Sequence, residues 1–175
     1  MFGRTLFPGR FQPVHKGHVE ALRWLLGISE EVIVLVTAAQ YSFTFENPFT
    51  AGERITMLRR ALREVWDRLY VIPLDNIPDN SLWLDYVEKR VPGFEAVCTG
   101  NPFVELLARA KGYEVVRPPN FDRELFQGRL VRRLIAEGGK WDELVPVEVA
   151  EYIKSIGGED RLRLLASTEN VVFKL

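Results

Sequence analysis

Residues 9–18, GRFQPVHKGH, decide the fold, because they separate the first apolar run from the first helical pattern. The apolar run at residues 5–7 is typical of a buried strand, and the Pro and Gly residues after it break it into a loop. Apolar residues then recur at helical spacing, which predicts a helix over residues 17–27. His15 and His18, the only two histidines of the chain, therefore lie in its first turn and share a face.

This helix start is suited to binding phosphate. Its unpaired backbone N–H groups and the positive end of its dipole attract anions, and the guanidinium of Arg10 adds charge in the same loop. A zinc site is the alternative for a histidine pair, and a capping role without function is another. Because there is no third histidine and the single cysteine, Cys98, is distant in sequence, we expect no metal ligands among the protein side chains. We predict a polyphosphate site at Arg10, His15 and His18.

Short β-branched runs alternate with helical patterns over the first two thirds of the chain, and only helical patterns follow. Such alternation predicts an α/β fold: a Rossmann-like open parallel sheet with helices on both faces and a helical C-terminal appendage. We expect one domain over residues 1–175, with a core at 1–124 and C-terminal helices at 125–170. The expected strands are 4–8, 31–37, 69–73, 94–99 and 113–117, and the expected helices are 17–27, 51–65, 81–90, 102–111, 128–137, 146–156 and 159–167.

Ligands in open parallel sheets bind at the carboxyl ends of strands. Three expected strand ends carry residues suited to this role: Gly9 after the first, Thr37 after the second, and Gly100 with Asn101 after the fourth. We therefore expect these residues near the site.

Composition limits the kind of partner. The chain has 175 residues, 47% of them hydrophobic and 27% charged, with a net charge of −1. This charge gives no reason to expect nucleic-acid binding. We see no signal peptide and no apolar stretch of membrane length, so we expect a cytoplasmic protein with no membrane contact.

The motif at residues 9–18 resembles a known family. H-x-G-H after a first strand is the signature of the adenylyl- and cytidylyltransferase superfamily, and the longer form is similar to that of archaeal nicotinamide-mononucleotide adenylyltransferases. The resemblance covers roughly residues 3–167. Further segments follow in the family's order: residues 46–54, 80–83, 100–102, 117–118 and 132–133.

The resemblance implies an enzyme that transfers AMP from ATP to nicotinamide mononucleotide (NMN), giving NAD and pyrophosphate. Mg²⁺ would enter with ATP, held mainly by phosphates and water. A homo-oligomer, tetramer or hexamer, is also implied. The family's binding positions correspond here to Gly9, Arg10, Phe11, His15, Gly17 and His18 in the first motif, Thr37, Asn80 and Trp83, Gly100 and Asn101 on the adenosine side, and Gly128, Arg129 and Arg132 at a second phosphate site.

We expect the two histidines to contact the α- and β-phosphates of ATP, and an anion there to favour their cationic form. Trp83 would stack on the nicotinamide ring. On its spacing alone, Trp83 is more simply a core residue of an amphipathic helix, and it is the match to the family's motif that favours stacking. Asn80 beside it could be only a helix cap.

Two departures from the family pattern leave other functions open. Gln127 and Arg129 replace the hydroxyl residues usual at the second phosphate site, and Phe43 stands where related sequences often carry histidine. The alternatives are a related transferase with another acceptor, such as phosphopantetheine or a CTP-using reaction, and a nucleotide-binding sensor without turnover.

Overall fold

The structure, a computed structural model, describes residues 1–173. The chain divides into two compact units, each described by itself. Unit 1 comprises residues 1–10, 20–39 and 64–120, and unit 2 comprises residues 11–19, 40–63 and 121–175. The 3-10 helix Arg63–Arg68 and helix α1 (Lys16–Leu25) each contribute residues to both units.

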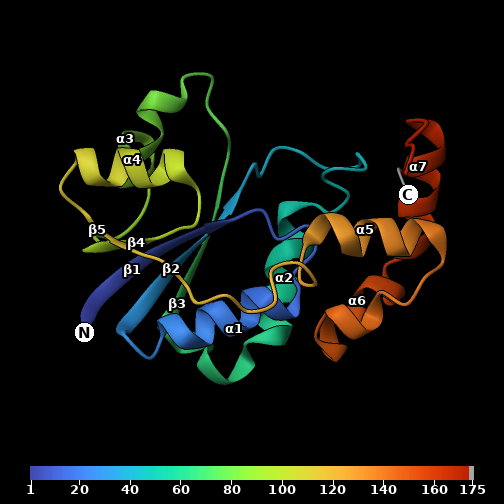
Figure 1. The fold of residues 1–175 in the computed structure, drawn as a ribbon, viewed down its shortest axis with the longest axis horizontal. Coiled ribbons are helices and arrows are strands. Elements are labelled where there is room, and N and C mark those ends of the chain that lie inside the picture. The colour runs from blue at the N-terminus through green and yellow to red at the C-terminus, as the bar shows by residue number, and fades with distance from the viewer. Residues whose placement is uncertain (174–175) are drawn as a thin grey trace. The chain divides into compact units, whose positions relative to one another are not determined.

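Unit 1 is a five-stranded parallel sheet in the order β3-β2-β1-β4-β5 (Figure 1). The order changes direction between β1 and β4, the kind of switch point at which α/β proteins bind ligands. The expected strands all form, and β4 and β5 are shorter than expected. Their bounds are β1 Phe2–Gly9, β2 Ser29–Thr37, β3 Leu69–Leu74, β4 Ala96–Cys98 and β5 Glu114–Val116.

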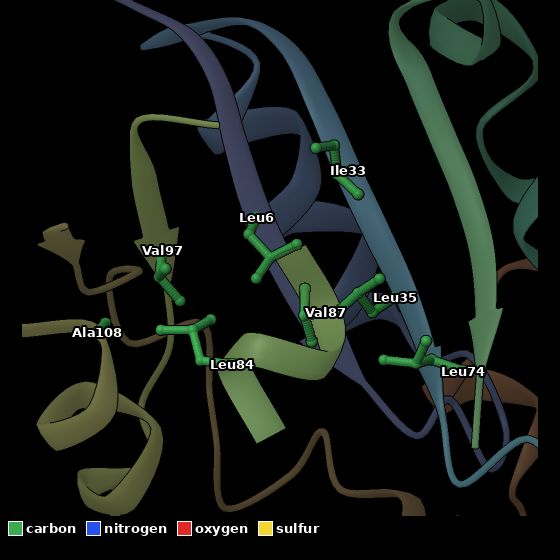
Figure 2. Packing of buried hydrophobic residues seen from close by; sticks show 8 residues of the cluster. All are labelled: Leu6, Ile33, Leu35, Leu74, Leu84, Val87, Val97 and Ala108. Atoms are coloured by element: carbon green, nitrogen blue, oxygen red, sulfur yellow. The ribbon is translucent and has the colours of Figure 1, made fainter. Parts of the chain in front are cut away.

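Helices cover both faces of this sheet, as predicted. Helices α3 (Trp83–Glu88) and α4 (Pro102–Ala110) lie on one side, and the unit 1 part of α1 lies on the other (Figure 1). Figure 2 shows Leu84 and Val87 of α3 directed at the side chains of the sheet. The buried cluster on this face consists of Leu6, Ile33, Leu35, Leu74, Leu84, Val87, Val97 and Ala108.

The third helix begins differently from the prediction. A 3-10 turn, Asn80–Leu82, precedes α3, and its cap is Asp79, whose carboxylate accepts from the Ser81 N–H at 2.9 Å. The helix cap considered at Asn80 is therefore one residue earlier, at Asp79. Asn80 is left exposed for another role.

Unit 2 contains the helical C-terminal part, as predicted, together with a helix from the middle of the chain. This is helix α2 (Ala51–Ala61), which ends at Ala61 instead of residue 65, and a 3-10 turn follows it. Thr50 and Glu53 form the capping box that begins α2. The remaining elements are α5 (Gly128–Glu137), a 3-10 turn (Asp142–Leu144), α6 (Val147–Ser155) and α7 (Gly158–Thr168).

Candidate active site

The histidine loop, residues 11–18, is built by local hydrogen bonds. The His15 N–H donates to Nδ1 of His18 at 3.1 Å, and the His18 N–H reaches Nδ1 of His15 at 3.3 Å. The two rings stack with centroids 3.5 Å apart and an interplanar angle of 18°. This reciprocal arrangement serves the first turn of α1 as a capping box serves other helices.

The bonds to Nδ1 fix which nitrogen of each histidine faces a ligand. Because Nδ1 accepts in both rings, the proton of each neutral imidazole lies on Nε2, which becomes a donor. Burial lowers the pKa of His15 to about 4. Burial and the neighbouring His15 lower the pKa of His18 below its usual value. Without an anion the pair is thus neutral and presents two N–H donors. The cationic form expected with a bound anion stays a prediction.

Gln12 anchors the histidine loop, and the sequence analysis did not single it out. Its side chain donates to the Phe49 carbonyl at 2.8 Å and accepts from the Phe49 N–H at 3.0 Å. Only 3% of Gln12 is exposed. A buried amide that satisfies both backbone groups of one residue holds that residue's segment in register with the loop.

Arg132 lies against the same loop. One terminal guanidinium nitrogen donates to the Gln12 carbonyl at 2.8 Å and the other to Glu46 at 3.1 Å, and the residue is 3% exposed. Arg129, one turn earlier, is exposed. The two arginines therefore have different surroundings, and their joint contact with a phosphate stays a prediction.

Two glycines here leave little room for a side chain. A Cβ at Gly17 would lie 2.9 Å from Cβ of Phe126 and 3.1 Å from Nδ1 of His15. A Cβ at Gly128 would lie 3.1 Å from the Gln12 carbonyl oxygen. Both glycines thus permit close packing within unit 2, a role distinct from the ligand contact expected of them. Phe11 packs on His18 at 4.7 Å between ring centroids and is 1% exposed.

Unit 1 contains a hollow at the carboxyl ends of its strands, which we name the strand-end pocket. It has a volume of about 340 Å³. Segments after β1, β2, β3 and β4 contribute to it, on both sides of the switch point. Its lining residues are Pro8, Gly9, Arg10, Thr37, Asn76, Asn80, Trp83, Thr99, Asn101, Phe103 and Val104.

The strand-end pocket brings together six residues expected at the site: Gly9, Arg10, Thr37, Asn80, Trp83 and Asn101. Gly100 is not in its lining, and Asn76 and Phe103 are lining residues that the sequence analysis missed. Their positions in the sequence could have indicated this role, because each residue follows the end of an expected strand.

Trp83 combines the two roles considered for it. It is half-buried and packs against the core cluster of unit 1, and it also lines the strand-end pocket. Asn101 has a fixed orientation there, because its Oδ1 caps α4 by accepting from the Phe103 N–H at 2.9 Å. The amide nitrogen of Asn101 is then the group that can donate to a ligand.

Within residues 1–173, no group of three or more His, Cys, Asp or Glu side chains is arranged to hold a metal ion. In the same part of the chain, no helix has the length and apolarity needed to cross a bilayer.

Comparison with known proteins identifies the class. Residues 6–133 match the family described as cytidylyltransferase-like, and the chain belongs to this family of nucleotidyltransferases. Within it, several similar relatives share the name nicotinamide-nucleotide adenylyltransferase. The protein of Pyrococcus furiosus is 49% identical over 94% of this chain and 89% of its own length. That of Pyrobaculum aerophilum is 51% identical over 95% of this chain and 96% of its own.

Solved structures confirm the fold. A bifunctional NMN adenylyltransferase/ADP ribose pyrophosphatase from Francisella tularensis, complexed with AMP and a Mn ion, matches with a TM-score of 0.80 at 18% identity. A second structure of such a protein from the same organism matches at 0.79 and 20%. The two matches include 97% and 98% of this chain. They include about half of each solved chain, 53% and 54%. The family membership and the Rossmann-like fold expected from the motifs are thus confirmed.

Proposed function

We propose that this chain transfers AMP from ATP to NMN, releasing pyrophosphate and forming NAD. An oxygen of the NMN phosphate attacks the α-phosphorus of ATP, a new P–O bond forms, and the bond from the α-phosphorus to the bridging oxygen breaks. The name shared by relatives 46–51% identical to the chain supports this reaction. The structural observation that carries it is the stacked pair of His15 and His18.

The histidine pair suits the charge that develops in this reaction. Negative charge builds on the bridging oxygen and on the pyrophosphate that leaves. Two Nε2–H donors, fixed in place by bonds to Nδ1, can bind these oxygens without a proton having to be taken up first. Arg10 and Arg129 would add positive charge toward the phosphates. Catalysis then rests on positioning and charge stabilisation, with no covalent intermediate on the protein.

The strand-end pocket is the proposed site of the mononucleotide. Trp83 offers an aromatic face for a cationic pyridinium ring, and Asn80 and the Asn101 amide nitrogen offer hydrogen bonds to the ring substituent or the ribose. The family resemblance places Gly100 and Asn101 on the adenosine side, and the proposal places the nicotinamide nucleotide at the same edge of the sheet. The contact of Gly100 and Asn101 with adenosine stays a prediction.

A divalent cation would be bound by the substrate. We expect the ion to be held mainly by the triphosphate and water. When bound, Mg²⁺ supplies neutralisation of phosphate charge. The protein's own residues would supply hydrogen-bond donors and positive charge to the phosphates.

The decisive experiment mixes the protein with Mg²⁺, ATP and NMN and measures NAD and pyrophosphate. Equal amounts of the two products are expected. Parallel reactions with nicotinic-acid mononucleotide, with phosphopantetheine, and with CTP in place of ATP test the other acceptors and donor. Binding of ATP without any product would favour the sensor function. The homo-oligomer expected from the resemblance stays a prediction, which light scattering after gel filtration would test.

A further inference from the structure

Arg161 on α7 binds the segment that precedes and begins α2. Its two terminal nitrogens donate to the two carboxylate oxygens of Glu53 at 2.7 and 2.9 Å, and one of them also reaches the Pro48 carbonyl at 3.1 Å. The side chains of Arg161 and Glu53 are 16% and 17% exposed. A two-pronged, largely buried pair fixes direction as well as distance, which a single surface contact does not.

Aromatic rings complete this contact. The Arg161 guanidinium lies 4.6 Å from the ring centroid of Phe43 and 5.8 Å from that of Phe49. Glu53 also accepts from the Thr50 N–H at 2.9 Å, so the same carboxylate caps α2. Although burial opposes it, hydrogen bonds from Arg161 and Thr50 hold the pKa of Glu53 below its usual value. Residues 48–53 are therefore held by one side chain of α7.

The segment held by Arg161 is the one to which the histidine loop is bonded. Phe49 exchanges both of its backbone hydrogen bonds with the Gln12 side chain, and Gln12 lies three residues before His15. A continuous set of bonds thus runs from α7 through residues 48–53 to the histidine loop. All of these residues belong to unit 2.

The segment after α7 adds a second contact to the same region. Glu169 accepts from the Phe45 N–H at 2.6 Å, and the ring of Phe173 lies 5.6 Å from that of Phe45. Glu169 and Phe173 thus contact Phe45 within unit 2. These contacts are made to Phe45, which precedes residues 48–53 in the sequence, whereas Gln12 binds Phe49.

We propose that Arg161 is a positioning residue: through residues 48–53 and Gln12, it holds the histidine loop in the conformation that presents both imidazoles to a phosphate. The effect on rate rests on the proposed function, whereas the effect on the loop does not. Small displacements of groups that stabilise a transition state reduce the rate by up to about 10²-fold.

The test compares Arg161→Gln with Arg163→Gln. Arg163 is on the same helix, its side chain is 45% exposed, and within residues 1–173 it pairs with Glu159 and Asp160 of that helix. The control therefore removes the same charge. In Arg161→Gln we expect kcat to fall by about 10- to 100-fold, with KM for NMN within about twofold of wild type. Amide hydrogen exchange of Phe49 and His18 should become at least about tenfold faster. The control should change neither quantity.

Two further variants keep the test decisive. Arg161→Lys retains a charge toward Glu53 without the fork and should show an intermediate kcat. Glu53→Gln with Arg161→Gln leaves no unpaired buried charge; it should regain thermal stability but not kcat or the slow exchange, and it replaces the single variant if that does not fold.

Wild-type exchange at Phe49 and His18 in Arg161→Gln, or in the double variant, would overturn the proposal. An equal loss in Arg163→Gln would also overturn it, because the effect would then be general. Failure of the wild-type protein to make NAD would refute the proposed function, while the exchange measurement would still decide the role of Arg161.

Discussion

The strand-end pocket and the histidine loop owe their geometry to different parts of the chain. The pocket is made where four parallel strands end, so the sheet order itself brings Arg10, Thr37, Trp83 and Asn101 together. The histidine loop is held by side chains from far along the sequence, such as Arg132, 120 residues after Gln12. We infer that topology suffices to build a binding pocket, whereas a reactive loop needs its own set of buried polar bonds.

The largest effect is expected at the histidine loop. His18→Ala removes an Nε2–H donor and the acceptor of the His15 N–H bond, so kcat should fall by about 10²–10³. Binding of NMN should stay within about twofold of wild type, because the strand-end pocket contains no part of His18. Steady-state kinetics and titration calorimetry measure the two quantities. A kcat within about threefold of wild type would refute the role of His18.

The second largest effect is expected on acidification, which should lower the free energy of unfolding through the histidine loop. The pKa of His15 is lowered to about 4 by burial, below the value near 6.5 of an unfolded chain, so the unfolded state binds more protons between these values. Stability is therefore full above about pH 6.5 and is lost as pH falls toward 4. Between pH 7 and 5, we expect the protonation of His15 to lower the free energy of unfolding by about 2 kcal/mol.

Urea unfolding at several pH values measures this loss. His15→Gln is the matched variant, since glutamine offers an acceptor but does not titrate, and its slope between pH 7 and 5 should be smaller. An unchanged slope would show that His15 is as hydrated in the folded protein as in the unfolded chain.

A smaller effect is expected in the strand-end pocket. Trp83→Ala should weaken NMN binding by about tenfold, corresponding to roughly 1–2 kcal/mol, through loss of the stacking surface. Affinity for ATP should change much less. Since Trp83 also packs on the core cluster, Trp83→Phe is the control and should retain most of both affinities. Equal losses for the two ligands in Trp83→Ala would mean that the residue acts through the fold.

The smallest effect is expected at the start of α5. Arg129 is exposed, so its charge is screened by solvent, and Arg129→Ala should raise KM for ATP by about threefold. KM for NMN should not change. Arg123, also exposed, provides a comparison of equal charge. If both variants raise KM for ATP alike, the effect is long-range and Arg129 is no specific ligand.

Sequence periodicity predicted the sheet because buried parallel strands leave a strong local signal. The run of five buried residues from Val32 to Val36 is continuous, and all but Leu35 are β-branched. Loops at strand ends then follow from the order of elements. The boundaries at Ala61 and Trp83 were missed, since 3-10 turns continue the helical pattern of the sequence in a tighter geometry.

The anchors of the histidine loop leave no such local signal. Gln12 stands between Phe11 and Pro13 as one polar residue in a loop, and nothing in its neighbours shows that it will bond Phe49. The pairing of Arg161 with Glu53 spans 108 residues. Such partners depend on how distant helices pack, which periodicity does not encode; the motif revealed the reactive residues but not what holds them.

The reciprocal bonds between His15 and His18 have a consequence for a living cell. In the protein without a bound anion, burial lowers the pKa of both imidazoles, so their hydrogen-bond donors do not depend on the proton concentration between about pH 6.5 and 8. A cell whose interior drifts by several tenths of a pH unit under starvation or heat would keep this pair in the same protonation state. The supply of the product would then be insulated, at this pair, from a disturbance that alters many histidine-dependent steps at once.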